Sequence, residues 1–240
     1  MKILVTAGST QVMIDKVRAI TNIFHGRTGT EIAFDLSWNG HQNEVVLVTS
    51  NPLLVKEFED RYMAGYRYRS GGGASWDPIR HPRALLYKTF AELADIMEEE
   101  IRTGGYDVVI HSAAVSDYQV AGVFERGADE RLTEADSSAK ISSKHQELFL
   151  RMVPTFKIVD RIRKEWGFKG NLVKFKLEVG KSDEELIEIA RRSRAVSDAD
   201  LIVANCLEWA RERAYIIDRK GKAKSVSRDE LPEALAGRLK

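Results

Sequence analysis

The sequence predicts an α/β fold: a three-layer, Rossmann-like and mostly parallel sheet with a C-terminal hairpin and a flexible lid loop. Two observations carry this prediction. Short apolar runs rich in Val, Ile and Leu alternate with amphipathic runs, which is typical of buried parallel strands joined by helices. The first such run ends in a glycine turn at Gly8, the kind of position at which a sheet of this class binds its ligands.

The short apolar runs are the candidate strands: Ile3–Thr6, Glu44–Thr49, Leu85–Lys88, Asp107–Ser112, Glu147–Met152, Leu172–Leu177 and Asp200–Asn205. Helices fill most of the gaps between them. One begins after Thr89, an N-cap with Glu92 three residues later, and ends at Gly104-Gly105. A second spans Ser182 to about Ser197 and has three acidic residues in its first turn, where the helix dipole favours negative charge.

The C-terminal region has a different pattern. Ala214–Asp218 and Lys222–Val226 flank Arg219-Lys220-Gly221, which predicts a hairpin, and a final helix starts from Asp229. We expect residues 1–240 to form one domain, because this length suffices for a single α/β domain with a substantial core.

Two stretches interrupt the alternation. Tyr66–Pro82 combines interleaved Tyr and Arg with Gly71-Gly72-Gly73, and we expect a flexible loop that forms a hairpin or a subunit contact rather than a nucleic-acid surface. Gln119–Ser138 is polar and lacks clear periodicity, and a loop this long in a compact domain is usually functional or disordered. Because it leads directly to Lys140, it predicts a lid.

Composition excludes several classes of partner. Lys and Arg total 37 against 36 Asp and Glu, so no global field attracts nucleic acid or an anionic membrane. The single cysteine, Cys206, cannot form an internal disulfide, and neither a long apolar run nor a signal peptide opens the chain. We therefore expect a cytoplasmic protein. The histidines are scattered without an i, i+4 pair, so no dedicated zinc site is expected and no metal ligand is assigned.

Several segments occur in a specific order: VTAGST, IDKVRAITN followed by GRTG, HSAAVSDY, AKISS, FKLE and DADLIVAN. From residue 2 to about residue 206 this order resembles the phosphopantothenoylcysteine synthetases, the phosphopantothenate-cysteine ligases of coenzyme A biosynthesis, in their free-standing bacterial form. The resemblance implies a two-step reaction. The carboxylate of 4'-phosphopantothenate attacks the α-phosphate of a nucleoside triphosphate and releases pyrophosphate, and the amine of cysteine then displaces the nucleotide.

The same resemblance implies the other components. Bacterial members usually use CTP with Mg²⁺, whereas eukaryotic relatives use ATP. Members are typically homodimers, and the tail hairpin or the Tyr66–Pro82 loop is our candidate for the contact. The partners are therefore small molecules and a second copy of the chain.

Three residues match the reactive positions of the family. Asn22 matches the asparagine that holds the acyl nucleotide, Arg18 the arginine of the second half-reaction, and Lys140 the first lysine of a flap that closes over the phosphates. An amide donates and accepts without a charge that would trap the product, and a guanidinium suits a carboxylate or phosphate. The alternatives are a turn cap for Asn22, a surface salt bridge for Arg18 and a solvated loop position for Lys140.

The remaining candidates line the predicted mouth of the sheet. Gly26 and Gly29 open the following helix, whose N-terminus suits the substrate phosphate or the triphosphate. The nucleotide-binding candidates are Gly8, Ser9, Thr10, Ala113, Ala114, Asp117 and Phe175. Among these, Asp117 suits ribose hydroxyls or Mg²⁺, and Phe175 lies where the family places an aromatic near the base, although a strand phenylalanine is normally part of the core.

Three departures from the family pattern stand out. Ser9 replaces a glycine, so a positive φ there would cost roughly 1 kcal/mol. Many fused bacterial members carry two lysines on the helix before the DLI strand, and the aligned positions here are Ser193 and Ser197. Asn205-Cys206 loses the usual carboxylate. Neighbouring arginines are candidates to replace the lost helix charge: Arg191, Arg192 and Arg194.

Two other functions fit parts of the sequence. An NAD(P)-dependent Rossmann reductase requires a compact glycine fingerprint after the first strand and an acidic residue or Arg after the second, which here ends in Thr49-Ser50-Asn51. A non-catalytic nucleotide-binding regulator would need binding but no acyl-transfer residues. Pyrophosphate release that depends on phosphopantothenate separates the ligase from both.

Overall fold

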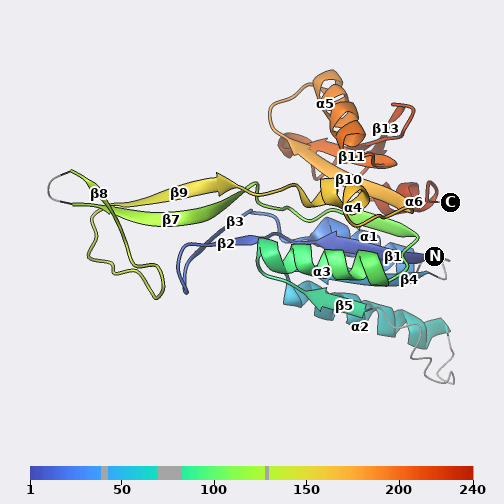
Figure 1. Cartoon of the computed structure of the whole chain (residues 1–240). Helices are drawn as coiled ribbons and strands as arrows, with labels where there is room; N and C mark the ends of the chain where they lie inside the picture. Colours follow the sequence, from blue (N-terminus) through green and yellow to red (C-terminus); the bar gives the residue numbers. More distant parts are fainter. Residues whose placement is uncertain (39–42, 70–82, 128–129, 240) are drawn as a thin grey trace.

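The computed structural model describes residues 1–38, 43–69, 83–127 and 130–239. Its centre is an eight-stranded sheet in the order β13-β12-β11-β10-β6-β1-β4-β5 (Figure 1). The strands from β11 to β5 run parallel: β1 (Lys2–Ala7), β4 (Glu44–Thr49), β5 (Arg83–Leu86), β6 (Val108–His111), β10 (Asn171–Glu178) and β11 (Leu201–Cys206). The tail adds the predicted antiparallel hairpin of β12 (Arg213–Ile217) and β13 (Ala223–Ser227). The predicted α/β fold is thus confirmed.

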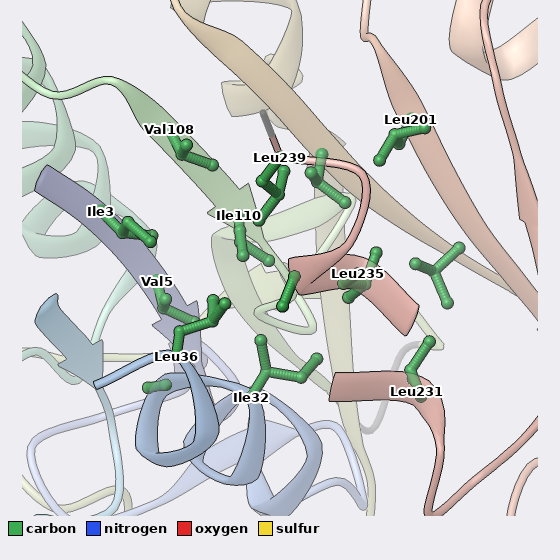
Figure 2. Close-up of a cluster of buried hydrophobic side chains, with 14 of the residues drawn as sticks. Ile3, Val5, Ile32, Leu36, Val108, Ile110, Leu201, Leu231, Leu235 and Leu239 are labelled. Carbon is green, nitrogen blue, oxygen red and sulfur yellow. The ribbon is translucent and has the colours of Figure 1, made fainter. Parts of the chain in front are cut away.

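Helices cover both faces of this sheet, because alternate residues of each buried strand point to opposite sides. Ile3 and Val5 of β1 pack with α1 (Arg27–Trp38), α2 (Pro52–Arg69) and α6 (Leu231–Ala236), in the cluster shown in part in Figure 2. Leu4 points to the other face, where it joins the cluster of α3 (Phe90–Thr103) and α4 (Ile158–Lys164). On that second face α5 (Asp183–Val196) covers β11, and a short 3-10 helix, η2 (Leu207–Trp209), follows this strand.

Both predicted helix starts are confirmed. The Thr89 hydroxyl accepts a hydrogen bond of 3.3 Å from the backbone of Glu92, and Ser182 accepts one of 3.2 Å from Glu185. In each case the glutamate returns a hydrogen bond to the cap backbone, which completes a capping box. These local pairs fix the first turns of α3 and α5.

The prediction that Gln119–Ser138 is a long loop is wrong, whereas its role as a lid stays a prediction. Most of this stretch forms β7 (Tyr118–Arg126) and β8 (Leu132–Glu134), which pair antiparallel with β9 (Leu148–Pro154) in an arm that projects from the main sheet (Figure 1). The strand predicted at Glu147–Met152 is β9, and it belongs to this arm rather than to the main sheet. Only Val123 is buried along β7, so the apolar alternation that would reveal a strand is weak.

Three further boundaries differ from prediction. Helix α2 ends with Tyr66–Arg69, which were predicted to begin a loop. Residues 70–82 of the predicted loop lie outside the described residues. The strand predicted at Leu85–Lys88 lies at Arg83–Leu86. Between β1 and α1, where no strand was predicted, the chain forms a small hairpin of β2 (Gln11–Met13) and β3 (Ala19–Thr21). Among the described residues, no helix combines the length and the apolar character needed to span a bilayer.

Candidate functional site at the carboxyl edge of the sheet

Three glycines allow the end of β1 and the start of α1 to approach closely. Gly8 and Gly26 adopt positive φ of 86° and 87°. A Cβ on Gly26 would overlap the backbone of Gly8, and one on Gly29 would overlap the Ser112 hydroxyl. Side chains are excluded here by contact as well as by conformation, so the backbone N–H groups of the first turn of α1 stay close to the carboxyl end of β1.

Ser9 does not adopt the positive φ that would have strained it. Among the described residues, only Glu130 and Asp198 do so outside glycine, and Gly8 provides the left-handed residue of the turn. Instead, the Ser9 backbone N–H donates to the Ser50 hydroxyl at 2.9 Å, and its own hydroxyl lies 3.0 Å from that of Thr21. The serine side chain therefore adds one hydroxyl contact to the turn without left-handed strain.

Ala113 and Ala114 join this turn to the end of β6. The N–H of Ala114 donates to the Gly8 oxygen at 2.8 Å, and its carbonyl accepts from the Thr10 N–H at 3.3 Å. The same carbonyl accepts a hydrogen bond of 3.0 Å from the side-chain amide of Asn22, which is itself exposed. The structure thus brings Asn22 together with the glycine turn and the two alanines.

A cavity of about 370 Å³ lies beside this turn, at the carboxyl ends of β6 and β10. This volume is within the range of sites for small ligands. Of the predicted residues, Ala113, Asp117 and Phe175 line it. Asp117 is ion-paired with Lys157, and Phe175 also packs against the core cluster on the α1 face. Further lining residues include His111, Phe156, Asp160, Lys174, Lys176 and Ser193.

Burial perturbs two titratable groups in the cavity. Loss of water around the charged form lowers the pKa of His111 to about 4, and the charge of Lys174 acts in the same direction. Burial likewise lowers the pKa of Lys174 to about 8, with Asp160 opposing the change. His111 is therefore neutral at pH 7, with Nδ1 2.9 Å from the Thr6 hydroxyl, whereas Lys174 remains largely charged.

Arg18 and Lys140 lie at a different place from Asn22. The Arg18 guanidinium binds the buried carboxylate of Asp15 at 2.6 Å and the backbone oxygen of Ile141 at 2.8 Å. This ion pair holds the pKa of Asp15 well below its usual range. Lys140, the residue before Ile141, is exposed. Because Arg18 and Asn22 flank opposite ends of β3, they are about 13 Å apart along the chain.

The sequence pattern missed the cavity lysines. Lys174 and Lys176 alternate with apolar residues in β10, and two lysines inside a run predicted to be buried were the available signal. The arginine prediction was wrong for the two residues with defined contacts. Arg191 donates to the Gly221 oxygen, and Arg194 donates to the Ala199 oxygen and, at 3.4 Å, to the Arg219 oxygen, so both face the β12–β13 turn rather than the cavity.

The described residues contain no group of three or more His, Cys, Asp or Glu side chains that could hold a metal ion. Cys206 is buried, with its sulfur 3.6 Å from the Lys181 oxygen. Its environment is that of a small core side chain at the end of β11.

Comparisons with known proteins match one protein family over most of this chain. Residues 1–60 and 82–238 match the family described as the DNA/pantothenate metabolism flavoprotein C-terminal domain. The chain is 32% identical over 229 residues to the coenzyme A biosynthesis bifunctional protein CoaBC of Thermococcus kodakarensis, covering 95% of this chain and 47% of that protein. It spans about half the length of the curated relatives that it matches, since the corresponding share of the Methanocaldococcus jannaschii CoaBC is 40%.

Solved structures share the fold. The DNA/pantothenate metabolism flavoprotein from Streptococcus pneumoniae superposes with a TM-score of 0.75 at 28% identity, covering 100% of this chain and 98% of that one. A Cab2 mutant in complex with phosphopantothenate-cysteine gives a TM-score of 0.66 at 17% identity, covering 98% and 85%. The second likeness, at this identity, concerns the fold alone.

Proposed function

Since the chain belongs to the family of DNA/pantothenate metabolism flavoprotein C-terminal domains, we propose that it joins 4'-phosphopantothenate to cysteine through an acyl-nucleotide intermediate. One observation carries the proposal. The Ala113-Ala114 backbone connects the glycine turn at Gly8, with Asn22 and the N-terminus of α1, to a cavity lined by lysines and carboxylates. An acid and a nucleoside triphosphate can meet across this connection.

Each step of this reaction needs donors and cations rather than a protein nucleophile. In the first, a carboxylate oxygen attacks the α-phosphorus, the bond to the β-phosphate breaks and pyrophosphate leaves. In the second, the cysteine nitrogen attacks the acyl carbon, the carbon–oxygen bond breaks, and the nucleoside monophosphate leaves as the amine loses a proton. Negative charge develops on phosphoryl and then on carbonyl oxygen, which fixed N–H donors and cations stabilise.

The residues near the turn suit the acid and the reacting phosphoryl group. Asn22 Nδ2 donates to Ala114 O, which holds the amide beside the connection between turn and cavity. A side-chain amide has two N–H donors, so its second N–H can donate to a phosphoryl oxygen. The backbone at Gly26 and Gly29 opens α1, where a helix N-terminus attracts the substrate phosphate.

The nucleotide fits the cavity side. Asp117 and Phe175 both line the cavity, and we assign Asp117 to the ribose hydroxyls and Phe175 to the base. Mg²⁺ bound with substrate phosphates usually takes one or two protein carboxylates, and Asp117 and Asp160 both line the cavity, so these residues fit a Mg²⁺-nucleotide. The ion would offset the negative charge of the phosphate oxygens. We propose CTP as the nucleotide, with ATP as the alternative.

Lys140 is proposed as the lysine that closes over the phosphates. Its neighbour Ile141 is buried against the arm, and Arg18 holds the backbone of Ile141. Arg18 thus acts on the reaction by positioning the Lys140 segment.

We further propose that the protein is a cytoplasmic homodimer. Within the described residues, β13 is an edge strand of the main sheet, and an edge strand offers unpaired backbone groups to a second copy. Of the two predicted contacts, we therefore propose the tail hairpin, while residues 70–82 lie outside the described part. Sedimentation equilibrium gives the mass directly, and twice 27.1 kDa is expected.

The experiment is a pyrophosphate-release assay with 4'-phosphopantothenate, cysteine, Mg²⁺ and each of the four nucleoside triphosphates in turn. Release that requires phosphopantothenate is expected, with CTP the best nucleotide. A reductase or a non-catalytic regulator would release none. Asn22→Asp should lower the rate roughly a hundredfold, because a carboxylate repels the phosphoryl oxygens and cannot donate to them.

Asn43→Asp is the matched control. Asn43 also donates its amide to a backbone carbonyl, that of Leu36 at 3.0 Å, but away from the candidate site. Its rate should equal that of the unmodified protein. Equal rates for Asn22→Asp and the unmodified protein would remove Asn22 from the site.

A further inference from the structure

Lys174 differs from the other lysines of the cavity in its partners. Lys157 pairs with Asp117, and Lys176 pairs with Glu178 at 3.0 Å. Lys174 has no carboxylate within ion-pair distance among the described residues. Its Nζ donates to the Ser193 oxygen at 3.0 Å and to the Ser197 hydroxyl at 2.6 Å.

This lysine is also the most deeply placed cation of the cavity. Only 8% of its surface is exposed, and a buried ammonium without a counter-ion is costly. The Ser197 hydroxyl also contacts Asp160 Oδ1 at 2.6 Å, so the carboxylate of Asp160 lies one hydroxyl away from the ammonium. An ammonium has three N–H donors, and the two serine contacts leave one for a ligand in the cavity.

Two serines at the C-terminal end of α5 hold the ammonium of Lys174. Ser193 lies in the last turn of α5, and Ser197 is its C-cap residue. The Nζ of Lys174 reaches both from β10, across the interface between strand and helix. Arg191 and Arg194 of the same helix point instead to the β12–β13 turn, so the positive charge at this junction comes from Lys174.

We propose that Lys174 is the cation of this chain that binds the phosphates of the nucleoside triphosphate, held in place by Ser193 and Ser197. This inference rests on the proposed function for the identity of the ligand. It deepens that function by assigning the polyphosphate charge to a residue of β10. Asp160 then orients Ser197, which in turn fixes the direction of the ammonium.

A purely structural role is the competing explanation. Lysines often hydrogen-bond the last carbonyls of a helix, and Ser193 is in the last turn of α5. The two roles predict different effects of replacing Lys174. A helix cap affects stability alone, whereas a phosphate ligand affects affinity for triphosphate far more than affinity for monophosphate.

The test is calorimetric titration of the full chain with CTP, CMP, ATP, AMP and inorganic tripolyphosphate, without phosphopantothenate. Lys174→Met should weaken binding of the preferred triphosphate and of tripolyphosphate roughly ten- to a hundredfold, the loss expected for one hydrogen bond to a charged group. Monophosphate binding should change less than about twofold. Arg194→Met is the control, because Arg194 is a cation of the last turn of α5 whose guanidinium binds the backbone oxygens of Ala199 and Arg219, away from the cavity.

Lys174→Gln provides a second variant, which keeps a donor for the Ser193 oxygen but removes the charge. Triphosphate affinity within twofold of the unmodified protein in a folded variant would overturn the proposal, as would equal losses for mono- and triphosphate. Failure of both variants to fold would make Lys174 a structural residue and would also overturn it. If the unmodified protein binds triphosphate through Lys174 but releases no pyrophosphate with phosphopantothenate, only the ligase proposal fails.

Discussion

Arg18 donates a hydrogen bond of 2.8 Å to the backbone oxygen of Ile141, the residue that follows Lys140. Asp15 completes this contact, because its carboxylate accepts both the Arg18 guanidinium and the Ile141 N–H at 3.0 Å. The hairpin of β2 and β3 is thereby attached to the segment that carries Lys140. The segment is thus anchored at Ile141, whereas its neighbour Lys140 is exposed.

Asp15→Asn should therefore release the Lys140 segment. The neutral amide has one acceptor oxygen instead of two, and it cannot form the ion pair with Arg18. Tryptic cleavage after Lys140, followed by mass spectrometry, should become faster than in the unmodified protein. Asp136→Asn is the control, since Asp136 lies in the same segment and accepts a local hydrogen bond from the Ser138 N–H. Identical cleavage rates for the two variants would contradict the anchoring role of Asp15.

Gly26→Ala tests the close approach of β1 and α1. Gly105 also has a positive φ, of 65°, but has open space around it, whereas a Cβ on Gly26 would overlap Gly8. Gly105→Ala should lower the free energy of unfolding by about 1 kcal/mol through backbone strain alone. Gly26→Ala should lower it by about 1–3 kcal/mol more through the added overlap. Urea denaturation measures both, and equal losses would mean that contact at Gly26 is unimportant.

The pH dependence of stability should contain a contribution from His111. Its pKa is lowered to about 4 in the folded protein from 6.5, so between these values the unfolded chain binds more protons. The free energy of unfolding should consequently fall as the pH drops through this window, by about 3 kcal/mol in all from this residue. Above pH 6.5 the contribution is constant.

His111→Asn should flatten this dependence, because asparagine does not titrate. Urea denaturation at pH 7, 6, 5 and 4.5 gives the slope for each protein. The assignment fails if His111→Asn retains the full slope.

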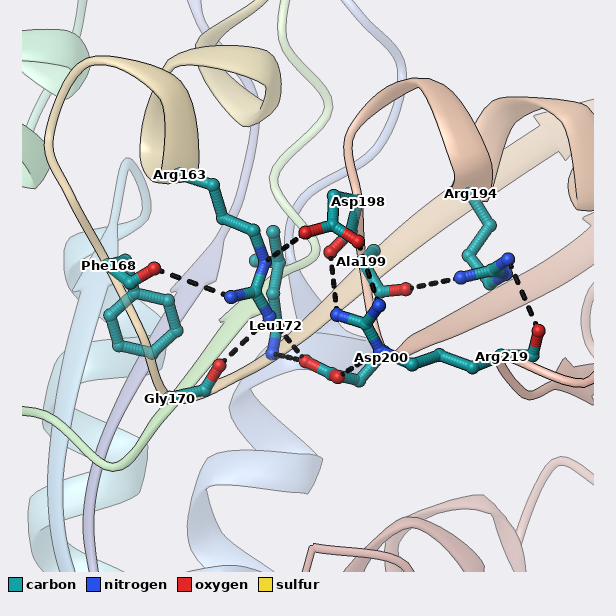
Figure 3. A network of polar contacts seen from close by, with 9 residues as sticks. All are labelled: Arg163, Phe168, Gly170, Leu172, Arg194, Asp198, Ala199, Asp200 and Arg219. Carbon is teal, nitrogen blue, oxygen red and sulfur yellow. Dashed lines mark hydrogen bonds and ion pairs between the residues drawn. The ribbon is translucent and has the colours of Figure 1, made fainter.

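An ion network lies at the amino-terminal ends of β10 and β11, away from the cavity at the carboxyl ends of the strands. It should contribute to stability rather than to function. Asp200 accepts hydrogen bonds from Arg163 at 2.6 Å, from the Leu172 N–H at 2.7 Å and from Arg219 at 2.6 Å (Figure 3). Asp200→Asn should lower the free energy of unfolding by about 2 kcal/mol, the value of hydrogen bonds to a charged group. Pyrophosphate release at a temperature where the variant is folded should be unchanged.

Asp198 provides the matched comparison in this network. Its side chain is 61% exposed and pairs mainly with Arg219, so Asp198→Asn should cost less than about 1 kcal/mol. A larger loss of unfolding free energy for Asp198→Asn than for Asp200→Asn would contradict this account. It would show that burial does not determine which carboxylate contributes more to stability.

Local signals in the sequence identified the main sheet correctly. The runs at β1, β4, β6 and β11 are buried on both faces, so their apolar residues are continuous and visible without knowledge of contacts. The caps at Thr89 and Ser182 depend on residues three positions apart, and such short-range pairs are readable from sequence. These elements could be predicted because their partners are close in the chain or uniformly apolar.

Long-range placement could not be predicted in the same way. β9 is rich in apolar residues, but only its pairing with β7 determines that it belongs to the arm. Asp15 lies 126 residues from Ile141, and nothing in either local sequence indicates their hydrogen bond. Lys174 was passed over for the same reason: its meaning comes from Ser193 and Ser197, which only the folded chain brings to it.

The most direct test of the central claim uses 4'-phosphopantothenate labelled with ¹⁸O in its carboxylate. If the carboxylate attacks the α-phosphate and cysteine then displaces the nucleotide, one labelled oxygen must leave with the nucleoside monophosphate, where mass spectrometry detects it. We predict one ¹⁸O in each monophosphate formed and none in the pyrophosphate. Phosphopantothenoylcysteine formed with unlabelled monophosphate, or no product with any nucleoside triphosphate, would contradict the account.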